Sequence, residues 1–171
     1  VYWAAKSSDR EDMVGSALDT FFRSMKASHE KFGANHSIVC FDHYSWRRDV
    51  FPEYKANRRE EEKADPEKAE DKRVIGAVLD DLRDYLSELT NVTVLHAKKC
   101  EADDFIGRWV SSRPNDRHVI LSSDSDYKQL ISDNVVVYNG VSNTLITGSG
   151  VYFQDENMIK KTDRVVTLNG E

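Results

Sequence analysis

The sequence of 171 residues contains few cysteines and prolines and no long hydrophobic run. Its two cysteines, Cys40 and Cys100, each lie in an apolar stretch, which favours buried thiols in a reducing cytosol over a disulfide framework. A single disulfide between Cys40 and Cys100 remains an alternative. No apolar run approaches the ~18–20 residues that span a bilayer, and there is no signal-peptide pattern, so we expect no membrane partner. Three prolines and 10% aromatic residues argue against a disordered chain.

Positive charge is also in short supply. Lysine and arginine total 24 against 30 aspartates and glutamates, which gives a net charge of −6. This balance disfavours nucleic acid as a partner at first sight. A net charge describes the whole surface, however, whereas binding takes place at a patch, so the exclusion does not hold by itself.

Strand-like and helix-like segments alternate along the chain, whose length suits one compact domain. Such alternation predicts an α/β fold in which a mostly parallel central sheet is flanked by helices. The apolar spacing predicts helices over residues 8–31, 74–89, 103–112 and 126–132, with Gly33 ending the first. Strands are expected over 36–42, 92–97, 118–123 and 134–139, with 144–147 as a hairpin partner and 149–161 as a linker helix.

Carboxylates follow three of the expected strands. Ligands bind at the carboxyl ends of strands in an open α/β sheet, so these acids converge if the strands are parallel neighbours. Their mutual repulsion then requires a cation, and an all-oxygen ligand set suits Mg²⁺ or Mn²⁺ better than zinc. The chain has no zinc-hydrolase, P-loop or serine-hydrolase motif. The candidate metal ligands are Asp42, Glu101, Asp103, Asp104, Asp124 and Asp126.

Residues 46–59, WRRDVFPEYKANRR, place five cations and three aromatic residues within fourteen positions. Lys55 and Arg58 are three apart and share a face if the segment is helical. Cations of this kind pair with phosphate oxygens, and aromatic rings stack on bases. An exposed cationic helix start is the plainer interpretation of the same pattern.

The ordered set Phe41-Asp42, WR, FPEYKANR, CEADD and SSDSDYKQL resembles the N-terminal nuclease domain of the flap endonuclease/5′-nuclease family, in particular bacteriophage 5′→3′ exonucleases. The resemblance implies a PIN-like domain over residues 1–140 with a helical arch at 44–73. Residues 141–171 would extend this domain. The family's first strand with its metal-binding aspartate, and its helix–hairpin–helix region, have no counterpart here.

The same resemblance implies a phosphodiesterase that uses two Mg²⁺ or Mn²⁺ ions at 5′ ends and flaps of DNA or RNA–DNA duplexes. It implies a monomer in the cytoplasm of a bacterial or phage-infected cell, with replication proteins as further partners. Its residue roles are Asp42, Glu101 and Asp103 at the first ion, Asp124 and Asp126 at the second, Asp104 nearby, Lys55 and Arg58 as catalytic cations, and Arg47 and Tyr54 with them in nucleic-acid binding.

Two other functions stay open. A relative without catalysis would bind nucleic acid, an alternative to which the missing first aspartate lends some support. An α/β phosphatase or phosphotransferase would use Asp124 and Asp126 as nucleophile and acid, but Tyr127 stands where such enzymes usually carry a small hydroxyl residue.

Overall fold

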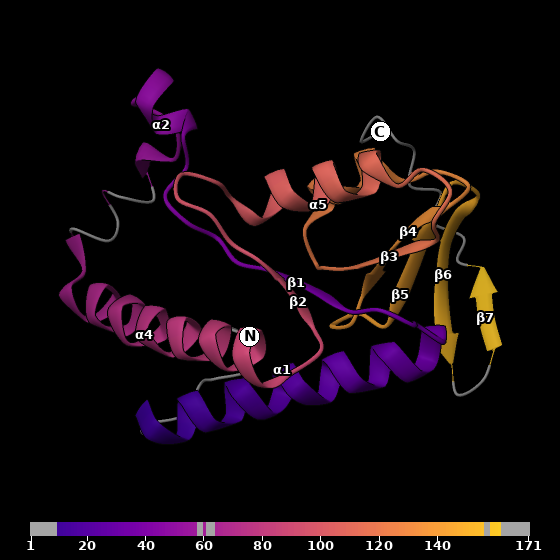
Figure 1. Ribbon diagram of the computed structural model, residues 1–171, viewed down its shortest axis with the longest axis horizontal. Helices are drawn as coiled ribbons and strands as arrows, with labels where there is room; N and C mark the ends of the chain where they lie inside the picture. Colours follow the sequence, from indigo (N-terminus) through magenta and orange to yellow (C-terminus); the bar gives the residue numbers. More distant parts are fainter. Residues whose placement is uncertain (1–9, 58–59, 61–63, 156–157, 162–171) are drawn as a thin grey trace. The chain divides into compact units, whose positions relative to one another are not determined.

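A computed structural model describes residues 10–57, 60, 64–155 and 158–161 (Figure 1). The chain divides into two compact units, Val1–Phe105 and Ile106–Glu171, each with its own core. The strands likewise form two sheets, one of two strands and one of five. The expected α/β class is confirmed, with helices and a small parallel sheet, but the described strands form a parallel pair and a mixed sheet rather than one mostly parallel central sheet.

The first unit begins with helix α1 (Arg10–Phe32). Gly33 ends this helix as predicted, because its φ of 57° is accessible to glycine without steric cost. The backbone N–H groups of Gly33 and Ala34 donate to the carbonyls of Glu30 and His29, respectively. These two carbonyls near the end of the helix therefore have hydrogen-bond partners. The sequence pattern therefore placed the end of α1 within one residue.

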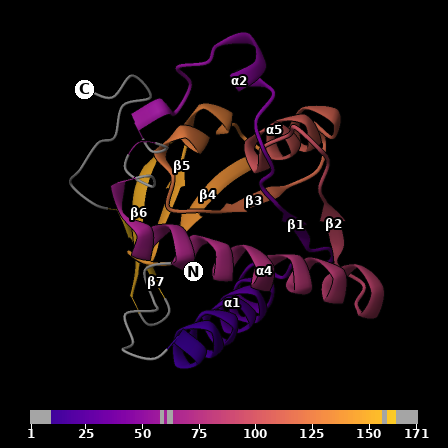
Figure 2. The same ribbon diagram turned by 90° about the vertical axis from the view of Figure 1, so that its left-hand side faces the viewer.

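Strands β1 (Ile38–Cys40) and β2 (Thr93–Leu95) pair in parallel, which confirms this part of the predicted sheet. Val39 pairs with Val94, so both side chains lie on the same face. Helices α1 and α4 (Pro66–Leu89) lie on one side of these strands in both views (Figures 1 and 2). The core of this unit consists of Phe41, Leu82 and Leu86, with Leu18, Phe21, Val39 and Val94 packed against them.

The segment between β1 and α4 contains the predicted arch, residues 44–73. Its first part holds the short helix α2 (Arg47–Val50), and its last eight residues form the first turns of α4. Lys55 lies between them with a φ of 54°, a left-handed conformation that is uncommon for a residue with a side chain. The arch itself stays a prediction.

The second unit contains β3 to β7, in that order across the sheet. Only β3 and β4 are parallel; the later strands are antiparallel, because the short connections between them permit hairpins but no crossover. The expected hairpin partner at 144–147 is confirmed as β5. The bounds are β3 His118–Leu121, β4 Val135–Asn139, β5 Thr144–Thr147, β6 Gly150–Asp155 and β7 Met158–Lys161.

The prediction of a linker helix over 149–161 is wrong, since β6 and β7 occupy that stretch. Tyr152 pairs with Leu145 of β5, and Phe153 pairs with Thr144. The free edge of β5 provides backbone hydrogen-bonding partners for β6. This pairing outweighs the local preference of residues 149–161 for helix.

Helix α5 (Ala102–Ser112) starts in the first unit and continues into the second, in agreement with the predicted helix. The 3-10 helix η2 (Ser125–Leu130) takes the place of the helix expected at 126–132. The second core contains Ile120, Tyr127, Val135 and Val137. Within the described residues, no helix combines the length and apolar character that crossing a membrane requires.

Candidate functional site

The carboxyl ends of β1 and β2 meet at one edge of their sheet. Backbone N–H groups of Phe41 and His43 donate to the carbonyls of Leu95 and Cys100, so the two chains continue together beyond the strands. Asp42 lies between these bonds, and its Oδ1 accepts the N–H of Ala102 at 2.7 Å. The end of β1 is thereby tied to the start of α5, as the sequence analysis expected of parallel neighbours.

Glu101 is the buried carboxylate of this edge, with only 7% of its surface exposed. Its Oε2 accepts hydrogen bonds from Ser45 Oγ at 2.6 Å, Tyr54 OH at 3.0 Å and Arg47 Nη1 at 3.0 Å. Its Oε1 accepts one from Lys55 Nζ at 2.6 Å. These donors come from the arch segment, about fifty residues away along the chain.

The protonation of Glu101 follows from these contacts. Burial raises the pKa of its carboxyl, but hydrogen bonds from Lys55, Ser45 and Tyr54 outweigh burial, and the net pKa lies below the ordinary value. Glu101 is therefore an anion at neutral pH. The pKa of Lys55 is raised: burial lowers it, but the hydrogen bonds with Glu101 and Tyr54 and the attraction to the Glu101 charge together outweigh burial.

Asp104 is the second carboxylate at this site that forms an ion pair. Arg47 donates from Nη2 to Oδ1 at 2.7 Å and from Nη1 to Oδ2 at 3.1 Å. The hydrogen bond from Arg47 lowers the pKa of Asp104 despite partial burial. Oδ2 also accepts the backbone N–H of Glu101 at 2.9 Å, so Asp104 caps the helix whose first turn it occupies.

Asp103 precedes Asp104 in the first turn of α5 and is exposed. Arg58 lies outside the described residues. The other two predicted ligands, Asp124 and Asp126, belong to the second unit and follow β3, where both are exposed. Asp124 Oδ1 accepts the N–H of Asp126 at 2.9 Å and so caps η2.

The residues that the structure describes contain no group of three histidine, cysteine, aspartate or glutamate side chains close enough to hold a metal ion. Glu101 and Asp104 nonetheless fit a hard divalent cation chemically. Both are ionised oxygen ligands, and each already binds a cationic side chain. The assignment of the six carboxylates as ligands stays a prediction.

Sequence reasoning missed Ser45, which is 2% exposed and holds Glu101. The sequence pattern assigned Tyr54 to nucleic-acid binding and Lys55 to both catalysis and nucleic-acid binding, whereas the structure brings the side chains of both residues onto Glu101. The local sequence around FPEYK does not indicate the contacts with Glu101, because they depend on how this segment folds toward the start of α5.

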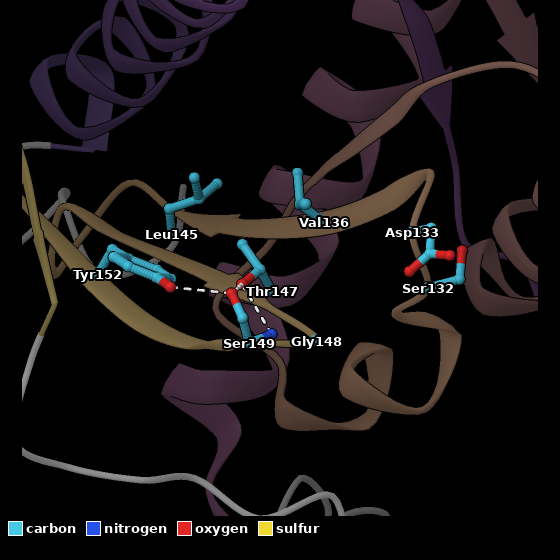
Figure 3. Close-up of a pocket in the computed structure, with 8 residues that line it drawn as sticks. All are labelled: Ser132, Asp133, Val136, Leu145, Thr147, Gly148, Ser149 and Tyr152. Atoms are coloured by element: carbon cyan, nitrogen blue, oxygen red, sulfur yellow. Dashed lines mark hydrogen bonds between the residues drawn. The ribbon is translucent and has the colours of Figure 1, made fainter.

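A separate pocket of about 660 Å³ lies in the second unit, lined by residues of β4, β5 and β6 and of the loop before β4 (Figure 3). Ser149 Oγ is 2.8 Å from Tyr152 OH and 3.0 Å from Thr147 Oγ1. Asp133 and Ser132 lie at the other end of the pocket. The hydroxyls of Ser149 and Tyr152 therefore pair with each other rather than with a base, and the pocket offers no activated nucleophile among its lining residues.

Several solved structures with a similar fold come from bacteriophage T5. The 5′-exonuclease with bound zinc ions matches at a TM-score of 0.67 and 20% identity, covering 75% of this chain and 49% of that one. The flap endonuclease in complex with DNA and metal ions matches at 0.62 and 19%, covering 82% and 51%. This chain thus spans about half the length of the proteins it matches.

Residues 1–163 also match the family model described as 5′-3′ exonuclease, N-terminal resolvase-like domain. That match extends over both sets of strand-end carboxylates and over the arch segment. The chain belongs to the 5′-3′ exonuclease N-terminal domain family.

Proposed function

We propose that this chain is the nuclease part of a metal-dependent 5′-nuclease, which hydrolyses phosphodiester bonds at 5′ ends and flaps of DNA or RNA–DNA duplexes. Membership of the exonuclease family supports the reaction class. The observation that carries the proposal is Glu101, a nearly buried carboxylate held ionised at the carboxyl edge of a parallel strand pair. Burial penalises this charge, its donors offset the penalty, and carboxylates with such perturbed pKa values are concentrated at functional sites.

In this proposal the carboxylates hold two Mg²⁺ or Mn²⁺ ions. Asp42, Glu101 and Asp103 serve the first, Asp124 and Asp126 the second, and Asp104 lies nearby. Bound divalent ions would supply Lewis-acid stabilisation of the phosphate and a water of lowered pKa. All six residues present oxygen ligands of the kind these ions prefer.

Four residues of the arch segment have distinct roles in this proposal. Lys55 and Arg58 would neutralise charge that develops on the scissile phosphate, and Arg47 and Tyr54 would position the 5′ strand. The acidic net charge does not oppose this, because these cations belong to one segment of the chain.

We also propose the division into a nuclease domain over 1–140 and an extension over 141–171. The protein would act as a monomer that works beside replication proteins in the cytoplasm.

The decisive experiment is the double variant Asp124→Asn with Asp126→Asn in the whole protein, assayed on a 5′-flap duplex with Mg²⁺. Asparagine keeps the Oδ1 acceptor with which Asp124 caps η2, so the fold should be retained. Cleavage should fall by about 100-fold or more, the equivalent of several kcal/mol of transition-state stabilisation. Asp133→Asn, an exposed aspartate of the same unit, is the matched control and should cut normally.

Unchanged cleavage by the double variant would refute the proposal. The non-catalytic alternative has its own test, isothermal titration of the wild-type protein with MgCl₂ or MnCl₂. The proposal expects saturable binding, whereas a relative that only binds nucleic acid needs none.

A further inference from the structure

Ser45 is among the most deeply buried side chains in the described part of the protein, at 2% exposure. A hydroxyl in such a position costs free energy unless it is hydrogen-bonded. Ser45 Oγ donates to Glu101 Oε2 at 2.6 Å and accepts the backbone N–H of Arg47 at 3.3 Å. Its surroundings therefore fix both Ser45 and the carboxylate oxygen that it contacts.

The two oxygens of Glu101 are bound unequally. Oε2 receives three donors, from Ser45, Tyr54 and Arg47, which exceeds the two lone-pair sites that one carboxylate oxygen offers in its plane. Oε1 receives the ammonium of Lys55. Oε2 is thus saturated by protein donors, whereas among the described residues Oε1 contacts one flexible side chain, that of Lys55.

Lys55 is suited to leave this position. Its side chain is about one-third exposed, against 9% for that of Glu101, and its four-carbon stem can swing into solvent. Its backbone has a φ of 54°, a left-handed conformation that is strained for a residue with a Cβ. Release of the ammonium from Glu101 would leave this backbone conformation free to relax.

We propose that Ser45 and Tyr54 are positioning residues that hold Oε2 of Glu101, so that Oε1 exchanges between the ammonium of Lys55 and a divalent cation. This inference rests on the proposed function. The exchange couples metal binding to phosphate binding. A cation that binds Oε1 releases the ammonium of Lys55, which can then bind a phosphate group. No covalent bond is made or broken.

The test is a calorimetric titration of MnCl₂ into the DNA-free whole protein, which measures the affinity for Mn²⁺. Ser45→Ala should weaken Mn²⁺ binding about 10- to 100-fold, the usual cost of losing a group that orients a metal ligand. Tyr54→Phe removes one hydroxyl from a half-buried ring and should weaken binding in the same direction without risk to the fold. Ser45→Thr keeps the hydroxyl and should restore much of the affinity.

Lys55→Ala should act in the opposite direction and tighten Mn²⁺ binding about tenfold, because it removes the competitor for Oε1. Lys98→Ala is the matched control, an exposed lysine in the loop before Glu101 that removes the same charge. A role in stability alone would not make Ser45→Ala and Lys55→Ala shift metal affinity in opposite directions.

The outcomes separate the two proposals. A wild-type protein that binds no Mn²⁺ overturns the proposed function and this inference with it. Wild-type binding with equal affinity in Ser45→Ala and Tyr54→Phe overturns the positioning role and leaves the nuclease proposal intact. If Lys55→Ala and Lys98→Ala bind Mn²⁺ with the same affinity, the exchange at Oε1 is overturned.

Discussion

Asp42 and Ala102 are sixty positions apart in the sequence, yet Oδ1 of Asp42 accepts the backbone N–H of Ala102 at 2.7 Å. That N–H belongs to the first residue of α5 and has no partner within the helix. A carboxylate at a helix N-terminus also interacts favourably with the helix dipole. Asp42 thus joins the end of β1 to the start of the helix that carries Asp103 and Asp104.

The first prediction concerns Asp42. Asp42→Ala should lower the free energy of unfolding by about 1 kcal/mol, the usual cost of losing a helix-capping acceptor. Asp42→Asn keeps an acceptor oxygen and should cost less than half of that. Urea unfolding in the presence of EDTA measures both, and equal losses in the two variants would contradict the capping role of Oδ1.

The second prediction concerns Arg47, whose guanidinium bridges Glu101 and Asp104. Arg47→Lys keeps the charge but removes the planar fork that contacts both carboxylates, so we expect a loss of about 1 kcal/mol in unfolding free energy. Arg23→Lys is the control, because Arg23 forms an exposed pair with Asp19 and should change little. Equal effects in the two variants would show that the fork contributes nothing beyond its charge.

Local signals explain most of what the sequence could predict of the fold. The helices α1 and α5 follow from apolar spacing, and Gly33 marks the end of α1 by a conformational property of glycine itself. The stretch containing β6 and β7 was predicted as helix, because its partner strand is invisible in a local pattern. Strand formation there depends on pairing between residues such as Tyr152 and Leu145.

The candidate site shows the same division. The position of Asp42 and Glu101 at the ends of β1 and β2 could be predicted, because parallel strands bring their carboxyl ends to one edge. The contact between Ser45 and Glu101 spans 56 positions and carries no motif. Serine is common in loops, and only the burial of Ser45 reveals that its hydroxyl has a specific partner.

The third prediction tests the core of the first unit. Leu86 of α4 is fully buried in a core to which α1 and the two strands contribute, and Leu86→Ala should cost about 2–5 kcal/mol through lost burial and the cavity left behind. Leu89 ends the same helix and is 71% exposed, so Leu89→Ala should stay within about 0.5 kcal/mol. Urea midpoints at unchanged slope measure both, and comparable losses would contradict the packing described for α4.

The last prediction concerns the thiol of Cys40 at the end of β1. Burial, with the nearby charge of Asp42, raises its pKa from 9.0 to about 11. In a Cys100→Ser background with EDTA present, alkylation by iodoacetamide at pH 8 should be about 100-fold slower in the folded protein than in urea, because the thiolate is the reactive form. The folded state binds the proton more tightly, so stability contributed by this group is present below pH 9 and is lost as the pH rises toward 11. A rate profile that inflects near 9, or equal rates in buffer and in urea, would show that Cys40 is not held in this environment.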